Sequence, residues 1–184
     1  GFHVLDQQIE FLDVAGDGPD ARAARTLAGR LGLLGPCGSV RFLGPLDPAA
    51  ALARLETADL LIHPSRREGL PMVLLEALRA GTPALASPVG AIGEALPDGT
   101  GLLHVPPDDP DALAAAVADL AADPKARRRI GAAGRRLFED RFRLERHVER
   151  LAEIYGWPTA GPSGGEARAA ACADPRRREG RDHA

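Results

Sequence analysis

The chain has 184 residues, of which 45% are hydrophobic and 27% charged, with a formal net charge of −3. This length suits one domain with a sizeable core, and no run of about 18 apolar residues or targeting segment is present, so a soluble domain is expected. The two cysteines, Cys37 and Cys172, lie far apart, which argues against a disulfide framework and favours a reducing, cytoplasmic location.

Strand-like and helical segments alternate along the first 105 residues, after a short helical piece over residues 1–8. We expect strands at residues 10–15, 40–43, 60–63, 83–86 and 102–105, and helices at residues 20–31, 48–55 and 71–80. This alternation predicts an α/β fold: a Rossmann-like parallel sheet with helices on both faces, joined by right-handed crossovers. Ligands of such sheets bind outside the carboxyl ends of the strands.

The remainder is predicted to be helical up to residue 157. Asp109 is the expected N-cap of a helix over residues 110–122, and two further helices are expected over residues 125–141 and 144–155. In the helix over residues 125–141, Ile130, Leu137 and Phe138 would face the core. Residues 158–184 are rich in Gly, Ala, Pro, Ser and Arg, which is typical of a disordered tail.

The charge is uneven, because residues 124–150 hold 10 basic and 4 acidic side chains. Arginines on several helical faces with few aromatic residues favour a solvated helical surface over a nucleic-acid site. A weak, peripheral contact with an anionic membrane surface is the better of the functional alternatives.

The stretch from Glu68 to Gly81 organises the chain. Pro71 suits the first helical position and Gly81 the position after the last, and within this helix only Glu76 and Arg79 are not apolar. One hypothesis is that Glu76 pairs with Arg79, leaving Glu68 as a loop charge. The other is a ligand site, in which the first amides of the helix bind an anion such as a diphosphate. These amides belong to Met72, Val73 and Leu74, and Glu68 and Glu76 would flank the anion.

The motifs resemble those of family-4 retaining glycosyltransferases. Glu68 and Glu76 are separated by seven residues within the stretch His63-Pro64-Ser65-Arg66-Arg67-Glu68-Gly69-Leu70-Pro71. The likeness continues through residues 16–19, 41–44, 81–87, 98–103 and 106–110, in the order of the family. The resemblance implies the GT-B architecture of two Rossmann-like domains, of which residues 1–157 would be the C-terminal, nucleotide-sugar-binding domain without its first strand.

The resemblance also implies transfer of a sugar from a nucleotide diphosphate sugar, with retention at the anomeric carbon. The catalytic residue would be Glu68, which binds hydroxyls of the donor sugar, and Glu76 would bind the ribose. The remaining donor-binding residues would be Gly16, Leu46, Gly69, Leu70, Met72 and Val73. No cofactor or metal is implied, because no cluster of His, Cys or carboxylate residues has metal-ligand spacing, and His63 is expected to be structural.

The chain departs from the family where members carry an Arg and a Lys, just before a segment similar to residues 1–5. A diphosphate would then be held by backbone amides and by Arg66 or Arg67. An N-terminal GT-B domain, in cis or in trans, would supply the acceptor site, and the isolated chain is expected to be inactive. Two alternatives stay open: a non-catalytic nucleotide-sugar-binding or interaction module, and a GT-B-type sugar-nucleotide epimerase.

Overall fold

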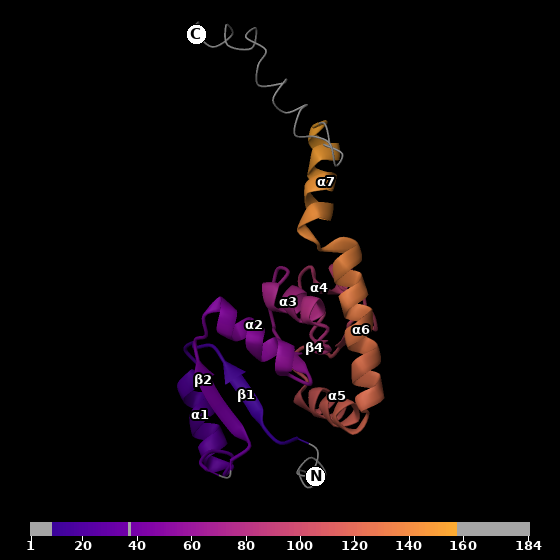
Figure 1. The fold of residues 1–184 in the computed structure, drawn as a ribbon. Helices are drawn as coiled ribbons and strands as arrows, with labels where there is room; N and C mark the ends of the chain where they lie inside the picture. Colours follow the sequence, from indigo (N-terminus) through magenta and orange to yellow (C-terminus); the bar gives the residue numbers. More distant parts are fainter. Residues whose placement is uncertain (1–8, 37, 158–184) are drawn as a thin grey trace, which may run out of the picture. The chain divides into compact units, whose positions relative to one another are not determined.

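The computed structural model describes residues 9–36 and 38–157. Strands and helices alternate up to residue 122, and two further helices follow (Figure 1). The elements in chain order are β1 (Leu12–Ala15), α1 (Ala21–Arg30), β2 (Val40–Gly44), α2 (Pro48–Thr57), β3 (Leu61–His63), α3 (Met72–Ala80), β4 (Ala84–Ala86), α4 (Ile92–Ala95), β5 (Leu102–His104), α5 (Pro110–Ala122), α6 (Pro124–Arg141) and α7 (Leu144–Tyr155).

The expected elements lie close to their predicted bounds. Helix α5 begins where predicted because the Asp109 carboxylate accepts a hydrogen bond of 2.9 Å from the Ala112 amide, beside Pro110 in the first turn. Helix α4 was not predicted, because four residues are too few to show a helical period. The helical piece expected over residues 1–8 and the tail expected over residues 158–184 lie outside the described residues.

All strand pairs are parallel, as the alternation predicts. The strands form two groups rather than one continuous sheet: β1 pairs with β2, and β4 lies between β3 and β5. Among the described residues, no strand pairs with the second edge of β1 or of β3. Sequence patterns indicate which segments are strands, whereas the continuity of a sheet depends on which strands are neighbours.

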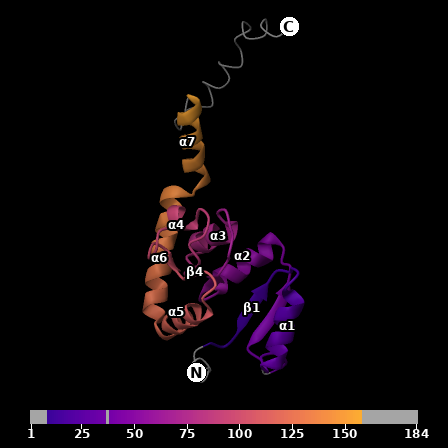
Figure 2. The same ribbon diagram turned by 180° about the vertical axis from the view of Figure 1, so that it is seen from behind.

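Helices α1 and α2 lie beside the β1–β2 pair (Figure 2). Charged side chains link both helices to this pair. The Asp13 carboxylate on β1 accepts hydrogen bonds from Arg41 Nε on β2 at 2.6 Å and from Arg54 Nη1 on α2 at 3.1 Å. From α1, the Arg25 guanidinium lies over the Phe42 ring, 4.6 Å from the ring centroid. These contacts order the β1–β2 pair, although its sheet has only two strands.

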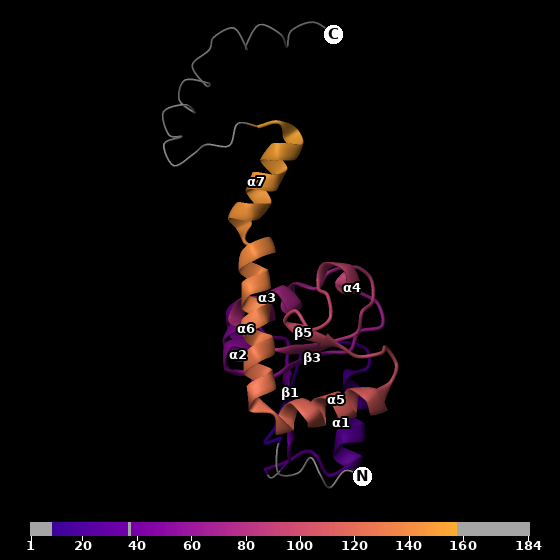
Figure 3. The same ribbon diagram turned by 90° about the vertical axis from the view of Figure 1, so that its right-hand side faces the viewer.

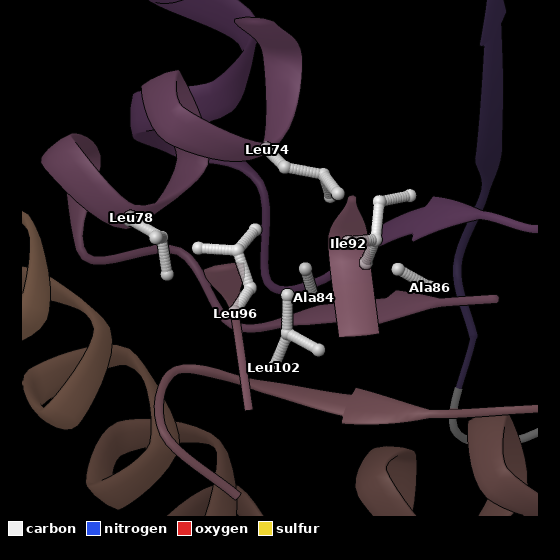
Figure 4. Close-up of a cluster of buried hydrophobic side chains, with 7 residues drawn as sticks. All are labelled: Leu74, Leu78, Ala84, Ala86, Ile92, Leu96 and Leu102. Carbon is white, nitrogen blue, oxygen red and sulfur yellow. The ribbon is translucent and has the colours of Figure 1, made fainter. Parts of the chain in front are cut away.

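Strand β4 carries core on both of its faces, because successive strand residues point in opposite directions. On one face, Ala84 and Ala86 pack in a cluster with Leu74, Leu78, Ile92, Leu96 and Leu102, from α3, α4 with its C-terminal neighbour, and β5 (Figure 4). On the other face, Leu85 packs with Val105, Leu120 and Ile130, near α5 and α6. Helices therefore cover both faces of this sheet, and Ile130 lies in the core as predicted.

Helix α6 lies along α3 and the β5 region (Figure 3). Glycines lie at this contact. A Cβ placed on Gly131 would be 2.0 Å from the Gly81 carbonyl oxygen, and one on Gly134 would be 2.7 Å from Leu78 Cδ2. Gly81 ends α3 with φ of 78°, a left-handed conformation that glycine adopts without strain. Leu137 and Phe138 also pack against the first core cluster, as predicted.

The described residues from Arg143 to Trp157 belong to a second unit, which contains α7. Leu144, Val148, Ile154 and Trp157 are exposed, and the Trp157 ring stacks on Tyr155 with centroids 5.2 Å apart. Within the described part of the chain, every helix is too short or too polar to cross a membrane.

Candidate functional site

The predicted site lies at the carboxyl end of β3, in the loop that leads into α3. Pro71 has φ of −70° and ψ of 131°, so it is extended and the helix begins at Met72, one residue later than predicted. The Leu74 amide donates to the Pro71 carbonyl at 3.1 Å, so the prediction of a free Leu74 amide is wrong. Among the described residues, no hydrogen bond is found for the Met72 and Val73 amides, which leaves these two donors available to an anion.

The side chain of Glu68 is held by two neighbours. Ser65 Oγ donates to Glu68 Oε1 at 3.1 Å, and His63 Nε2 lies 3.3 Å from the same oxygen. Ser65 Oγ and His63 Nε2 are themselves 3.1 Å apart. The Glu68 side chain is 31% exposed, so its carboxylate is both restrained and accessible to solvent. The His63 ring therefore contacts the predicted catalytic carboxylate, and its structural role stays a prediction.

The backbone at Glu68 and Gly69 is held by Gly90 and Ala91, in the loop after β4. The Ala91 amide donates to the Gly69 carbonyl at 3.1 Å. Gly90 has φ of 57°, and a Cβ placed on it would be 1.8 Å from the Glu68 carbonyl oxygen. Only a residue without a side chain fits here, so this loop and Glu68 form one packed unit. Nearby, Ser87 is fully buried, and its Oγ has no hydrogen-bond partner among the described residues.

Glu76 lies on α3, one turn after the free amides, and is half-buried. Among residues 9–36 and 38–157, no hydrogen bond or ion pair to its carboxylate is found, so the hypothesis of a Glu76–Arg79 pair is wrong. The backbone carbonyl of Arg79 accepts a hydrogen bond from Arg135 Nη1 of α6. A half-buried carboxylate without a protein partner retains its full capacity to accept hydrogen bonds from a ligand.

The two arginines of the loop differ. Arg66 Nε donates to the carboxylate of Asp108, which follows β5 and has φ of 58°. Arg67 is exposed, and the described part of the chain shows no ion pair for it. Arg67 is therefore the more available cation for a diphosphate, whereas Arg66 would have to leave Asp108.

Gly16 and Leu46 lie in the β1–β2 group, after β1 and after β2 respectively. Gly16 has φ of 111°, and its amide donates to the Gly44 carbonyl at 2.7 Å. It borders a hollow of ≈ 360 Å³, whose wall includes Asp17, Pro19, Arg25 and Phe42 but none of the β3–α3 loop. The structure thus brings Glu68, Gly69, Leu70, Met72, Val73 and Glu76 onto one loop and helix start, and places Gly16 and Leu46 on a separate strand pair.

Sequence reasoning missed Ser65 and Gly90. Ser65 precedes Glu68 by three residues, a spacing at which a hydroxyl often bonds a nearby group, yet this signal is common in loops. Gly90 is separated from Glu68 by more than twenty residues, and nothing in the sequence shows that their backbones touch.

Comparisons with known proteins identify the family of the chain. The family model "Glycosyl transferases group 1" matches residues 5–137. A glycogen synthase of Mycobacterium tuberculosis is 37% identical over 117 residues, or 64% of this chain and 28% of that protein. A D-inositol 3-phosphate glycosyltransferase of Streptomyces avermitilis is 36% identical over 153 residues, or 83% of this chain and 29% of that protein. The chain thus spans less than a third of the length of these relatives.

Solved structures share the fold. A sucrose-phosphate synthase from Thermosynechococcus elongatus matches with a TM-score of 0.67 and 30% identity, over 78% of this chain and 37% of that one. Anabaena Alr3699/HepE in complex with UDP-glucose matches with a TM-score of 0.70 and 22% identity, over 85% of this chain and 45% of that one, a likeness that shows the fold alone. The fold is consistent with one Rossmann-like half of a GT-B glycosyltransferase. The chain belongs to the group 1 glycosyl transferases.

Proposed function

We propose that residues 1–157 form the donor-binding domain of a retaining glycosyltransferase that uses a nucleotide diphosphate sugar. One observation carries this proposal: the restrained carboxylate of Glu68, the free amides of Met72 and Val73, and the unpaired carboxylate of Glu76 lie on one loop and the helix that follows it. The family and the relatives support glycosyl transfer, and Alr3699/HepE, which shares the fold, has a structure in complex with UDP-glucose.

Each group has a chemical role in this proposal. The amides of Met72 and Val73 hold the diphosphate at the positive end of α3, with Gly69 and Leu70 shaping the approach. Glu68 accepts hydrogen bonds from hydroxyls of the donor sugar, and Glu76 accepts them from the ribose. Transfer releases a nucleoside diphosphate, and the amides stabilise the negative charge that develops on this leaving group.

We further propose that the working enzyme includes a strand and a domain beyond the described residues. The open edges of β1 and β3 would accept a parallel strand between them, which would join the two strand groups and bring Gly16 and Leu46 to the donor. Phe11 and Leu12, at the open strand, are 45% and 42% exposed and would be covered by such a strand. An N-terminal GT-B domain, in cis or in trans, would supply the acceptor site, so the isolated chain would bind a donor without transferring its sugar.

Membrane contact is the weaker part of the proposal. In α6, Arg127 Nη1 donates to the carbonyls of Leu120 at 2.6 Å and Ala121 at 2.9 Å, and Arg135 Nε donates to Glu139 at 2.7 Å. These two side chains are engaged within the protein, which reduces the basic surface that α6 could present to lipid headgroups.

Calorimetry with the 184-residue chain tests the proposed function. UDP, UDP-glucose, GDP and GDP-mannose are titrated separately, and at least one nucleotide sugar should bind. Glu76→Gln should weaken the nucleoside diphosphate and its sugar conjugate equally, by roughly fivefold, because a ribose-binding acceptor is lost. Glu56→Gln, at an exposed position on α2, is the matched control and should leave both affinities unchanged.

If none of these nucleotides binds, or if Glu76→Gln has no effect, the proposed function is wrong. Binding followed by sugar transfer to added acceptors, with the purified chain alone, would contradict the proposed need for a second domain. Binding without transfer, even when an N-terminal domain is supplied, would favour the non-catalytic module.

A further inference from the structure

Three polar side chains meet at the end of β3 and in the loop after it: His63, Ser65 and Glu68. The contacts form a triangle, with Ser65 Oγ 3.1 Å from Glu68 Oε1, His63 Nε2 3.3 Å from the same oxygen, and Ser65 Oγ 3.1 Å from His63 Nε2. The His63 side chain is 19% exposed and that of Glu68 31% exposed. The cluster is thus partly shielded from water but open on the side of Glu68.

The chemistry of the groups decides which atoms carry the hydrogens. An ionised carboxylate only accepts hydrogen bonds, so the hydroxyl hydrogen of Ser65 points to Glu68 Oε1. For the same reason, His63 contributes a favourable contact only when Nε2 carries its hydrogen. Both donors converge on Oε1, and among the described residues no hydrogen bond to Oε2 is found.

The backbone at Glu68 and Gly69 is also restrained. The Ala91 amide binds the Gly69 carbonyl, and Gly90 packs on the Glu68 carbonyl. A glutamate side chain normally loses considerable rotamer entropy when a ligand orders it. Here the protein has ordered the carboxylate in advance, so a ligand that binds Oε2 loses less of this entropy on binding.

We infer that His63 and Ser65 are positioning residues, which hold Oε1 of Glu68 so that Oε2 is presented to a hydroxyl of the donor sugar. This inference rests on the proposed function and assigns Glu68 and its two supports to the sugar rather than to the nucleotide. Loss of either support should therefore reduce the preference for a nucleotide sugar over its nucleoside diphosphate, and leave the affinity for the diphosphate itself unchanged.

A spectroscopic experiment tests the geometry without any ligand. Long-range ¹H–¹⁵N correlation spectra of the ¹⁵N-labelled full chain are recorded at about pH 8, where an ordinary histidine with a pKa near 6.5 is neutral. We expect His63 to be protonated at Nε2, and this tautomer to lose population in Glu68→Gln, in which an amide replaces the carboxylate. A His63 ring protonated at Nδ1 in the wild-type chain would overturn the inference.

A binding experiment tests the role. Calorimetry compares UDP-glucose with UDP, and GDP-mannose with GDP, for the wild-type chain, Ser65→Ala and His63→Ala. We expect the preference for the nucleotide sugar to fall roughly fivefold in each variant, the effect of one lost hydrogen bond of ordinary strength. The conservative variants Ser65→Thr and His63→Gln retain a donor and should recover most of the preference.

Ser87→Ala is the matched control, because it removes a hydroxyl that is buried but makes no hydrogen bond among the described residues. It should leave the sugar preference unchanged, and a loss equal to that of Ser65→Ala would overturn the inference. Retention of the preference in both Ser65→Ala and His63→Ala would overturn it as well, without touching the proposed function. Failure of the wild-type chain to bind any of the four nucleotides overturns the proposed function, and this inference with it.

Discussion

Gly90 lies directly against the main chain of Glu68, with room for no side chain between them: a Cβ at position 90 would be 1.8 Å from the Glu68 carbonyl oxygen. Two segments that are far apart in the sequence are therefore packed at the candidate site. The position of the Glu68 backbone, and hence of its carboxylate, depends on this contact.

Gly90→Ala should destabilise the protein by about 2–5 kcal/mol, the sum of the cost of a left-handed alanine, about 1–2 kcal/mol, and of overpacking, about 1–3 kcal/mol. Gly99→Ala is the matched control, because Gly99 also has a positive φ, of 77°, but a Cβ added there would have nothing within 4 Å. Gly99→Ala should lower the free energy of unfolding only by the cost of a left-handed alanine, about 1–2 kcal/mol. Urea unfolding measures both, and equal losses would show that the contact with Glu68 contributes nothing.

Replacing a helical glycine by alanine usually stabilises a protein. The contact between α6 and the end of α3 predicts the opposite effect at Gly131. Gly131→Ala should destabilise the protein by about 1–3 kcal/mol, because its Cβ would be 2.0 Å from the Gly81 carbonyl oxygen. Gly29→Ala, in α1, meets only Leu34 Cδ1 at 3.7 Å and should stabilise by about 0.5–1 kcal/mol. Thermal unfolding of the two variants distinguishes them, and a stabilising Gly131→Ala would contradict the close packing.

Thr82 predicts the value of one buried hydrogen bond. Thr82 is buried, with 4% of the residue exposed, and its Oγ1 donates to the Leu55 carbonyl of α2 at 2.6 Å. Thr82→Val removes this hydrogen bond and leaves the Leu55 carbonyl with only the longer one from the Ala58 amide, at 3.3 Å, so it should cost about 0.5–1.5 kcal/mol. Thr57→Val, at an exposed position within α2, should change the free energy of unfolding by less than about 0.5 kcal/mol. Similar effects at both positions would argue against a specific role for Thr82.

The carboxylate of Asp123, at the start of α6, should make the free energy of unfolding depend on pH in the acidic range. The hydrogen bond from the Ala126 amide, with a further one from Lys125, holds the pKa of Asp123 below its ordinary value of 3.8. A lowered pKa means that the folded state favours the carboxylate, so this stabilisation is complete above pH 3.8 and is lost as the pH falls through the lowered pKa.

The measurement is a comparison of wild-type protein and Asp123→Asn by urea unfolding, at neutral pH and at about pH 3. The asparagine retains the capping oxygen but does not titrate. The stability advantage of the wild-type protein should therefore shrink at the lower pH, and an advantage that grows on acidification would contradict the assigned direction.

Local chemistry in the sequence by itself determined most of the elements. Proline and aspartate at the start of α5, and glycine after α3 and α7, act on neighbouring residues only, so the ends of these helices could be read from the sequence. The same is true of the Glu68–Glu76 spacing and of the parallel α/β class, because both follow from the order of residues along the chain.

Only the tertiary structure decided the environment of the candidate site. It showed that Pro71 is extended and that its carbonyl binds the Leu74 amide, that Glu76 does not pair with Arg79, and that Gly90 packs on Glu68. It also divided the strands into two groups, which separates Gly16 and Leu46 from the β3–α3 loop. These features are contacts whose geometry depends on the path of the loops, and a pattern of neighbouring residue types carries no information about that path.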